Sequence, residues 1–349
     1  MAGKKVYVGM SGGVDSSVTA LLLKNRGFDV TGVFMKNWTQ DFPGFKCPWE
    51  EDYQDAKRVA VELDIPFKVY DFETKYRHFV VDYMIDEYKS GRTPNPDIRC
   101  NEEVKFKLFL DTALKDGAEY IATGHYSRVV NGELRVAKDS NKDQSYFLYR
   151  ISPKSLEYSL MPIGEYTKPE VRKIAAKYRL ATADKKDSQG VCFVGNVNVK
   201  NFLQQFVTTK PGSIVDQNGK TIGEHDGALF YTIGQRHGLK IGGGLPYYVT
   251  GKNMRLNEVH VTNDISDKDL WHDQLNFGLA HWLNGPPKNA KNLSVRTRYR
   301  APLVKLKSLE ELDEGSWTAK LAEQIKALTP GQSAVIYEDD RVVGGGIVI

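Results

Sequence analysis

The sequence predicts a mixed α/β protein: a doubly wound parallel sheet, then a small, mainly β central domain, then a C-terminal β-barrel. In the first part, short apolar runs alternate with amphipathic helical patterns, which is typical of βαβ units. A glycine turn follows the first apolar run, as in nucleotide-binding sheets. After the helical pattern at 199–208 only short strand patterns remain, separated by Gly, Pro and Asp turns. We expect domains at 1–200, 201–265 and 266–349.

Composition narrows the class of protein. A chain of 349 residues is too long for one compact core. It is 41% apolar and 26% charged, without the roughly 18 consecutive apolar residues of a membrane span, so we expect no membrane association. The first strand pattern leaves no room for a targeting peptide, and three cysteines make no disulfide framework, so we expect a cytoplasmic protein. The net charge of +4 permits a nucleic-acid partner without requiring one.

Residues 4–17, KKVYVGMSGGVDSS, are the expected centre of the first domain. The pattern predicts a buried strand, a glycine turn and a helix that ends near Gly27. Free N–H groups and the helix dipole attract phosphate at such a turn, and three serines add hydroxyl donors. Asp15 is unusual beside phosphate unless Mg²⁺ lies between them. The alternative is an ordinary glycine turn in an α/β domain.

The remaining elements of the first domain follow in alternation. Strands are predicted at 29–36, 66–71 and 119–124, and helices at 50–63, 74–89 and 102–115. Ligands of parallel sheets bind beyond the carboxyl ends of the strands. Met35 and Gly124 fall on that edge, where each could flank an adenine. A core methionine and a turn glycine explain them equally well.

The segment 90–101, SGRTPNPDIRCN, predicts a fixed loop, because its prolines, asparagines and glycine disfavour helix and central strand. It places Asp97 three residues before Cys100. Arg99 lies between them, and a nearby Arg lowers the pKa of a thiol. By itself, however, a loop cysteine is more often inert than catalytic.

The other two cysteines are far from Cys100 in the chain. Cys192 lies 92 residues further on, in DSQGVCFVG, and Cys47 is equally isolated. Zinc and iron–sulfur sites usually contain locally paired cysteines, which are missing here. A three-cysteine metal site is the alternative to a pair of reactive thiols.

Polar segments follow the fourth predicted strand. A hairpin is expected at 127–137 with an Asn131-Gly132 turn, and residues 142–145 are expected to be polar and exposed. A helix at 167–179 begins with a capping box. Its basic residues could face phosphates, but we interpret them as a solvated face: Arg172, Lys173, Lys177 and Arg179.

The last two domains are predicted from strand patterns. Asn218-Gly219 predicts a hairpin turn in the central domain. In SVRTRYR, residues 294–300, the two-residue period of a strand places Arg296, Arg298 and Arg300 on one face. We interpret this face as a phosphate-binding stripe in preference to a solvated surface.

SGGVDSS resembles the S-G-G-x-D-S motif of the PP-loop ATP pyrophosphatases, which cleave ATP between its α- and β-phosphates and transfer AMP to a substrate oxygen. The resemblance implies ATP and Mg²⁺ as cofactors, with no metal held by protein ligands alone. The residues expected to bind ATP are Gly9, Met10, Ser11, Gly12, Gly13, Val14, Asp15, Ser16, Ser17, Met35 and Gly124.

Combined with NPDIRC and GVCFVG, this loop resembles the tRNA-specific 2-thiouridylases, which make 2-thiouridine at the wobble position. Further matches are ATGHY (122–126), KDQSYFL (142–148), YTIGQRHGL (231–239) and RYR (298–300), so the resemblance covers essentially the whole chain. It implies a nucleophile at Cys100, a persulfide carrier at Cys192 and target-base contacts at Asn95, Pro96 and Asp97. It also implies tRNA contacts at His125, Lys142, Asp143, Gln144, Arg298, Tyr299 and Gln332.

The implied activity is an ATP-dependent sulfur transfer to tRNA. Transfer of AMP to the uridine 2-oxygen makes that oxygen a good leaving group, and a Cys192 persulfide then supplies sulfur. Attack by Cys100 on the inner sulfur frees the outer one, and Asp97 is placed to handle protons on the base. The implied partners are a tRNA with a wobble uridine and a sulfur donor, either a cysteine desulfurase or a relay protein. The alternatives are a PP-loop synthetase acting on a small molecule and a non-catalytic RNA-binding protein.

Overall fold

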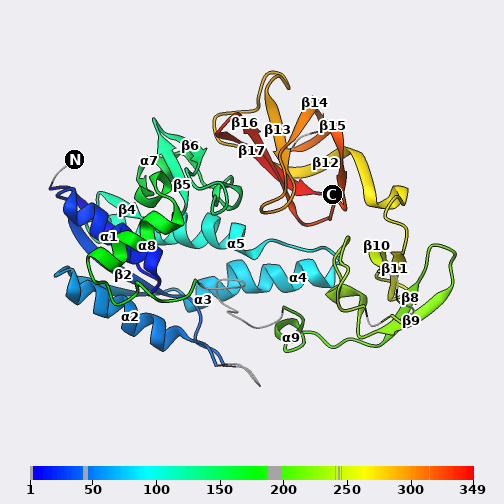
Figure 1. The fold of residues 1–349 in the computed structure, drawn as a ribbon, viewed down its shortest axis with the longest axis horizontal. Coiled ribbons are helices and arrows are strands. Elements are labelled where there is room, and N and C mark those ends of the chain that lie inside the picture. Colours follow the sequence, from blue (N-terminus) through cyan, green and yellow to red (C-terminus); the bar gives the residue numbers. More distant parts are fainter. Residues whose placement is uncertain are drawn as a thin grey trace.

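The computed structural model describes residues 3–41, 46–187, 199–239, 241, 242, 244, 246–313 and 315–349. Three sheets form in this part of the chain (Figure 1): a five-stranded sheet with the order β3-β2-β1-β4-β7, a four-stranded sheet with the order β10-β11-β8-β9, and an eight-stranded sheet. The predicted fold class is confirmed.

The first sheet is parallel throughout and starts from β1 in its middle. Its strands are β1 (Lys5–Gly9), β2 (Asp29–Lys36), β3 (Phe67–Asp71), β4 (Tyr120–Ala122) and β7 (Ser159–Leu160). β1 pairs with β2 on one side and β4 on the other, so the chain changes direction across the sheet at β1. The turn after β1 therefore lies at the topological switch point, where nucleotides bind in such sheets.

Alternate residues of β1 pack on opposite faces of the sheet, as a period of two requires. Val6 and Val8 are fully buried in the cluster under α1 (Val14–Asn25), α2 (Trp49–Glu62) and α8 (Lys168–Lys177). Tyr7 packs on the other face. That cluster contains residues of the helical segments α3 (Glu73–Tyr76), η1 (Arg77–Asp82), α4 (Tyr83–Lys89), α5 (Pro96–Arg99), η2 (Cys100–Leu108) and α6 (Phe109–Lys115).

The fixed loop expected at 90–101 is wrong for its second half. Pro96 occupies the first turn of α5, where a proline needs no N–H partner, and the helix continues through η2. Asp97 and Cys100 consequently lie on one helical segment. η2 is a π-helix, a conformation that is frequent at functional sites.

The central domain has a small sheet of its own, with β8 and β11 parallel. Its strands are β8 (Gly212–Val215), β9 (Thr221–His225), β10 (Tyr248–Asn253) and β11 (Glu258–Thr262). Its core includes Ile214, Val249 and Val259, each completely buried. The short helices elsewhere are η3 (Ser145–Phe147), α7 (Pro153–Glu157), η4 (Pro162–Glu165), α9 (Val199–Leu203), η5 (Ala228–Phe230) and η6 (Lys268–Leu270).

Six strands close into the C-terminal barrel, because β12 pairs with both β15 and β17. They are β12 (Trp271–Trp282), β13 (Leu293–Arg296), β14 (Val304–Asp313), β15 (Ser316–Lys326), β16 (Ser333–Glu338) and β17 (Arg341–Val348). The hairpin β5 (Ser127–Val130) and β6 (Glu133–Val136) of the first domain extends this sheet, with Arg135 paired to Arg341. Its Asn131-Gly132 turn has positive φ at both residues, as expected.

The stripe of arginines on one strand face is wrong. β13 ends at Arg296, and Arg300 has a φ of 62°. Because the backbone leaves the extended conformation, the two-residue period does not reach Arg298 or Arg300.

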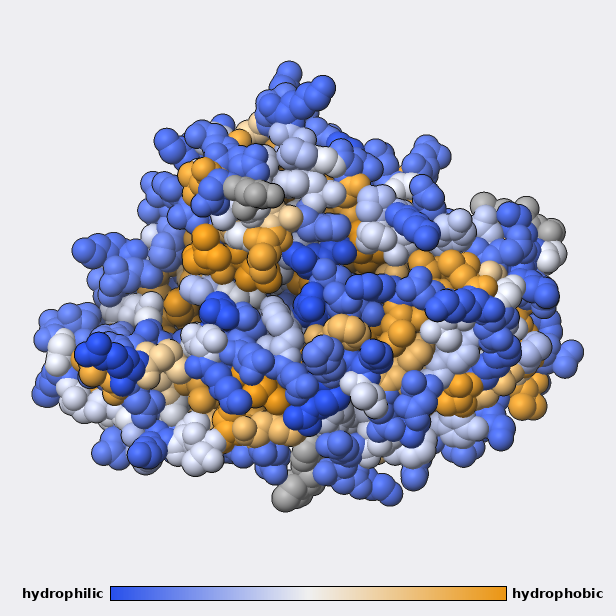
Figure 2. Space-filling view, turned by 180° about the vertical axis from the view of Figure 1, so that it is seen from behind, coloured by the Kyte–Doolittle hydropathy of each residue, from blue (hydrophilic) through white to orange (hydrophobic). Residues whose placement is uncertain are grey.

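The surface seen from behind is mainly hydrophilic, with apolar side chains gathered in separate patches (Figure 2). Within the described ranges, no helix combines the length and the apolar character that crossing a membrane requires.

Candidate nucleotide and thiol site

The turn between β1 and α1, residues 10–13, is called the phosphate loop here because the sequence predicts that it binds phosphate. It is shaped by glycine and by serines in and beside it. Gly12 has a φ of +72°, and a Cβ there would lie 2.3 Å from the carbonyl oxygen of Asp52. Gly13 is the N-cap of α1 and offers no capping side chain. Ser17 donates to the Gly13 carbonyl at 2.8 Å, and the Ser16 hydroxyl accepts from the Ser11 N–H at 3.2 Å. The serines thus bind the loop itself, and the first N–H groups of α1 are left for an anion.

Two further residues predicted to bind ATP pack tightly near this loop. A Cβ at Gly124 would lie 2.8 Å from the amide nitrogen of Ser16, so only glycine allows this approach to α1. The Met35 methyl group would lie 2.9 Å from a Cβ at Gly9. Both positions are therefore explained by packing, and their contact with an adenine stays a prediction.

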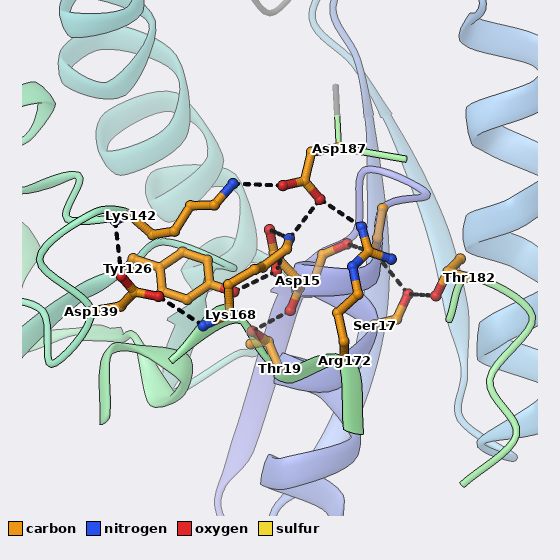
Figure 3. A network of polar contacts seen from close by, with 12 residues as sticks. Asp15, Ser17, Thr19, Tyr126, Asp139, Lys142, Lys168, Arg172, Thr182 and Asp187 are labelled. Carbon is orange, nitrogen blue, oxygen red and sulfur yellow. Dashed lines mark hydrogen bonds and ion pairs between the residues drawn. The ribbon is translucent and has the colours of Figure 1, made fainter. Parts of the chain in front are cut away.

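Asp15 is held by a cation and a phenol (Figure 3). The Lys168 ammonium lies 2.8 Å from both carboxylate oxygens of Asp15, and the Tyr126 hydroxyl donates to one of them at 2.8 Å. Lys168 begins α8, which packs beside α1. Burial and the charge of Asp15 raise the pKa of Tyr126, so its hydroxyl stays protonated.

Asp187 is the second carboxylate of this network. Its oxygens accept from Lys168 at 2.7 Å, Arg172 at 2.8 Å and Lys142 at 2.7 Å. Burial opposes ionisation, but the hydrogen bonds from Lys142 and Lys168 outweigh it and lower the pKa of Asp187 to about 2. The carboxylate is therefore ionised at neutral pH.

Most of this network is not apparent from the sequence. The prediction that Arg172 lies on a solvated helix face is wrong, because the guanidinium binds Asp187 and, at 2.6 Å, the Ala183 carbonyl. Lys168 carries no local signal, since it lies 153 residues from Asp15, and the motif DSQGVCFVG does not indicate what its Asp187 binds. The capping box of Thr167 and Glu170, which is confirmed, correctly located the start of the helix that carries Lys168 and Arg172.

Cys100 is 1% exposed, in the same apolar cluster as Trp38, which follows β2. Burial raises the pKa of its thiol, and the charge of Lys105 and a hydrogen bond with Tyr76 oppose this only in part. The activation expected from Arg99 is wrong. That guanidinium binds Glu102 at 2.7 Å and Glu103 at 3.5 Å.

The segment before Cys100 contains an unsatisfied acceptor. The Oδ1 atom of Asp97 is buried and has no hydrogen-bond partner among the residues that the structure describes. Asn95 is the N-cap of α5, and Pro96 is buried in its first turn. A carboxylate oxygen left without a donor is costly unless a ligand supplies one.

All three domains meet at Thr93 and Pro94, directly before Asn95. The Gln332 amide donates to the Thr93 carbonyl at 2.9 Å, and the Thr93 N–H donates to the Pro330 carbonyl at 2.9 Å. The Thr93 hydroxyl lies 3.4 Å from that of Thr232.

Arg298 ties the same junction together. One of its nitrogens donates to the Ile233 carbonyl at 2.7 Å, the Ala327 carbonyl at 2.9 Å and the Thr329 hydroxyl at 2.6 Å. Burial lowers the pKa of Arg298. The side chain thus links the central domain to the barrel beside Gln332.

The other predicted tRNA contacts are less exposed than expected. The predicted exposure of residues 142–145 is wrong for Ser145, which is completely buried, and for Asp143, which is 4% exposed and pairs with Arg296 at 3.3 Å. His125 is 7% exposed, and burial lowers its pKa well below the ordinary value, so the ring is neutral. Gln144 accepts from the Tyr126 N–H at 2.9 Å, and Tyr299 packs on Phe147 with ring centroids 4.6 Å apart.

Three family models match the chain in succession: "tRNA methyl transferase HUP domain" over 4–196, "tRNA methyl transferase PRC-barrel domain" over 200–263 and "Aminomethyltransferase beta-barrel domain" over 272–348. Curated relatives named tRNA-specific 2-thiouridylase MnmA match 99% of this chain. The relative from Idiomarina loihiensis is 46% identical with 96% of its length covered, that from Hydrogenovibrio crunogenus 46% with 93%, and that from Bacillus subtilis 45% with 94%. The chain belongs to the tRNA-specific 2-thiouridylase family.

Membership of the 2-thiouridylase family confirms the resemblance drawn from the motifs. Cys192, the predicted persulfide carrier, lies outside the described residues. Of the two cysteines that are described, both are free thiols, and Cys47 is buried in the same apolar cluster as Cys100. Within the described ranges, no group of three His, Cys, Asp or Glu residues is arranged to hold a metal ion.

Alkylation of Cys100 by iodoacetamide is expected to be slow and to keep accelerating above pH 9. A raised pKa means that the reactive thiolate forms only above the ordinary thiol value of 9.0, and burial also restricts access. Mass spectrometry of the Cys100 peptide after timed labelling from pH 7 to 10 measures this rate. A labelling rate that levels off below pH 8 would contradict a raised pKa.

Replacing Arg298 by alanine is expected to lower the melting temperature by several degrees and to weaken tRNA binding in a salt-dependent way. Three acceptors lose their donor, at roughly 1–3 kcal/mol for buried groups. Calorimetry and tRNA titrations at two salt concentrations measure the two effects. Replacing the exposed Arg255 is the control. An unchanged melting temperature would show that Arg298 does not stabilise the junction. Identical tRNA binding curves would show that Arg298 does not contact tRNA.

Proposed function

We propose that this protein catalyses the ATP-dependent 2-thiolation of the wobble uridine of tRNA, converting ATP to AMP and diphosphate. The observation that carries the proposal is the juxtaposition at one edge of the parallel sheet. The phosphate loop follows β1 there, and Trp38, which follows β2, belongs to the same apolar cluster as Cys100. His125 follows β4, with its ring 5.6 Å from that of Phe106 in the helix of Cys100.

The first step is adenylation of the base. The uridine 2-oxygen attacks the α-phosphorus of ATP, the bond to the bridging oxygen breaks, and pyrophosphate leaves. The N–H groups at the start of α1 bind the phosphates. Asn95, Pro96 and Asp97 bind the base, which must be splayed out of its loop, and the unpartnered Oδ1 of Asp97 accepts a proton or hydrogen bond from it. A Mg²⁺ ion bound with ATP near Asp15 would neutralise phosphate charge.

The second step transfers sulfur. The outer sulfur of a Cys192 persulfide attacks carbon 2 of the base, either directly or after release as hydrosulfide, and AMP leaves with the oxygen. The Cys100 thiolate attacks the inner sulfur and breaks the sulfur–sulfur bond, which leaves a Cys100–Cys192 disulfide. A dithiol reductant then restores both thiols. Burial raises the pKa of the Cys100 thiol, so the thiol is protonated in the resting enzyme and must lose its proton before it attacks.

The described residues on either side of Cys192 belong to the two centres of the proposed reaction. Asp187 belongs to the phosphate-loop network, and Phe202 lies in the apolar cluster that contains Cys100. This supports a role for the intervening segment in both steps.

Residues 1–200 form the adenylation and thiolation domain, while 201–265 and 266–349 hold the tRNA body. The tRNA contacts are His125, Lys142, Asp143 and Gln144 in the first domain and Arg298, Tyr299 and Gln332 in the third. The enzyme works in the cytoplasm, and a cysteine desulfurase or relay protein charges Cys192. The names of the relatives favour neither a small-molecule synthetase nor a non-catalytic RNA-binding protein.

The test is a reconstituted reaction with purified protein, unmodified tRNA, Mg-ATP and a sulfide or persulfide source. Mass spectrometry of the digested tRNA should show 2-thiouridine at the wobble position only when ATP is present. Pyrophosphate release without any thiolated nucleoside would favour a different adenylation reaction.

A further inference from the structure

Three cationic side chains converge on one carboxylate beside the phosphate loop (Figure 3). Lys142 follows β6, Lys168 begins α8, and Arg172 lies one turn further along α8. All three bind Asp187 at 2.7–2.8 Å. With Asp15 and Asp139, the cluster has three positive and three negative charges, so a ligand that displaces Asp187 meets three cations and only two carboxylates.

The positions of these cations are fixed by the backbone around them. The Asp139 carboxylate accepts from the N–H of Lys168 at 2.8 Å and from the N–H of Lys142 at 3.3 Å, so one residue sets the relative placement of two cations. Lys168 has 11% of its side chain exposed and is bound by both Asp15 and Asp187. A preformed set of donors loses little entropy when a ligand binds.

The cluster is nevertheless accessible. The side chains of Lys142 and Arg172 each keep 32% of their surface exposed, and Asp187 keeps 29%. A ligand can therefore reach the cations from solvent and replace Asp187, because a phosphate has the same charge sign and more acceptor oxygens.

We propose that Lys142, Lys168 and Arg172 bind the β- and γ-phosphates of ATP, and that Asp187 takes the place of these phosphates in the nucleotide-free enzyme. This inference rests on the proposed use of ATP. Cleavage between the α- and β-phosphates leaves additional negative charge on the departing pyrophosphate, and these cations stabilise that charge. A tRNA phosphate is the competing ligand, but the nearly buried Lys168 is bonded to Asp15 of the phosphate loop, which favours the nucleotide.

Asp187 competes with ATP in this arrangement, so removal of its charge should strengthen ATP binding. Asp187→Asn removes the internal anion and keeps the size of the side chain. ATP and inorganic pyrophosphate should then bind the full-length protein several-fold more tightly. If Asp187 only orders the cations, the same substitution weakens binding, and that result would overturn the proposal.

Removing one cation should have the opposite effect. Arg172→Gln is expected to weaken ATP and pyrophosphate binding roughly tenfold, or about 1.4 kcal/mol, and to leave the tRNA dissociation constant unchanged. Lys173→Gln is the matched control, because Lys173 is the exposed neighbour on the same helix. Melting temperatures identify any variant that fails to fold. Lys142→Gln then provides the second test, with ATP and pyrophosphate binding as its only readout because Lys142 is also a proposed tRNA contact.

The outcomes separate this inference from the proposed function. If the Arg172→Gln variant binds ATP as tightly as the wild-type protein does, the inference alone is overturned. A change confined to tRNA binding also overturns it, since the cluster then serves RNA. Wild-type protein that binds neither ATP nor pyrophosphate overturns both.

Discussion

Replacing Cys192 by serine is expected to abolish tRNA thiolation and to leave ATP-dependent pyrophosphate release intact. Serine has no sulfur on which a persulfide can form, so sulfur cannot reach the activated base. Adenylation of the base transfers AMP and needs no sulfur, so pyrophosphate release should not depend on this thiol. The activated tRNA should therefore accumulate or hydrolyse.

Nucleoside mass spectrometry and a pyrophosphate assay on the same reaction measure the two steps. Cys47→Ser is the matched control, because Cys47 is a buried thiol to which the proposed chemistry assigns no role. Full thiolation by the Cys192 variant would remove the persulfide assignment. Loss of pyrophosphate release together with thiolation would instead place this thiol in the adenylation step.

Replacing Gly12 by alanine is expected to reduce ATP use by roughly a hundredfold or more. The φ of +72° costs about 1–2 kcal/mol for an alanine, and its Cβ would lie 2.3 Å from the carbonyl oxygen of Asp52. This collision must displace the phosphate loop or α2. The N–H groups at the start of α1 are then no longer aligned to bind phosphate. Pyrophosphate release at saturating tRNA measures the loss.

Gly117→Ala separates the two causes. Gly117 has a φ of +95°, but a Cβ there meets nothing within 4 Å, so this variant has the backbone strain without the collision. It should lower the melting temperature slightly and keep normal ATP use. Wild-type ATP use by the Gly12 variant would show that the loop does not bind the phosphates through its backbone.

The sequence was sufficient where structure is decided locally. Periodicity located β1, α1 and the strands beside them, the capping box at Thr167 located α8, and Asn131-Gly132 located the hairpin turn. The segment around Pro96 failed for an instructive reason. Proline disfavours the interior of a helix but suits its first turn, and composition alone does not tell the two positions apart.

The candidate site was predictable only in part. Its motifs could be recognised because each lies within a few consecutive residues. The convergence of Lys142, Lys168 and Arg172 on Asp187 depends on how α8 packs against α1, which no local pattern encodes. Arg298 shows the same limit, since its acceptors belong to two stretches of chain, at Ile233 and at Ala327 to Thr329, that only the folded junction brings together.

The hairpin that joins the barrel sheet has a consequence for biosynthesis. β6 finds its neighbour in β17, the last strand of the chain, and Arg128 and Arg135 both bind Asp340 in the turn before it. The β5–β6 hairpin is complete when little more than a third of the chain has been translated. It can pair with β17 only after the C-terminal end has been made. Nascent chains that stop short of β17 would leave this edge without its final pairing, which makes late truncations more damaging to the first domain than their position suggests.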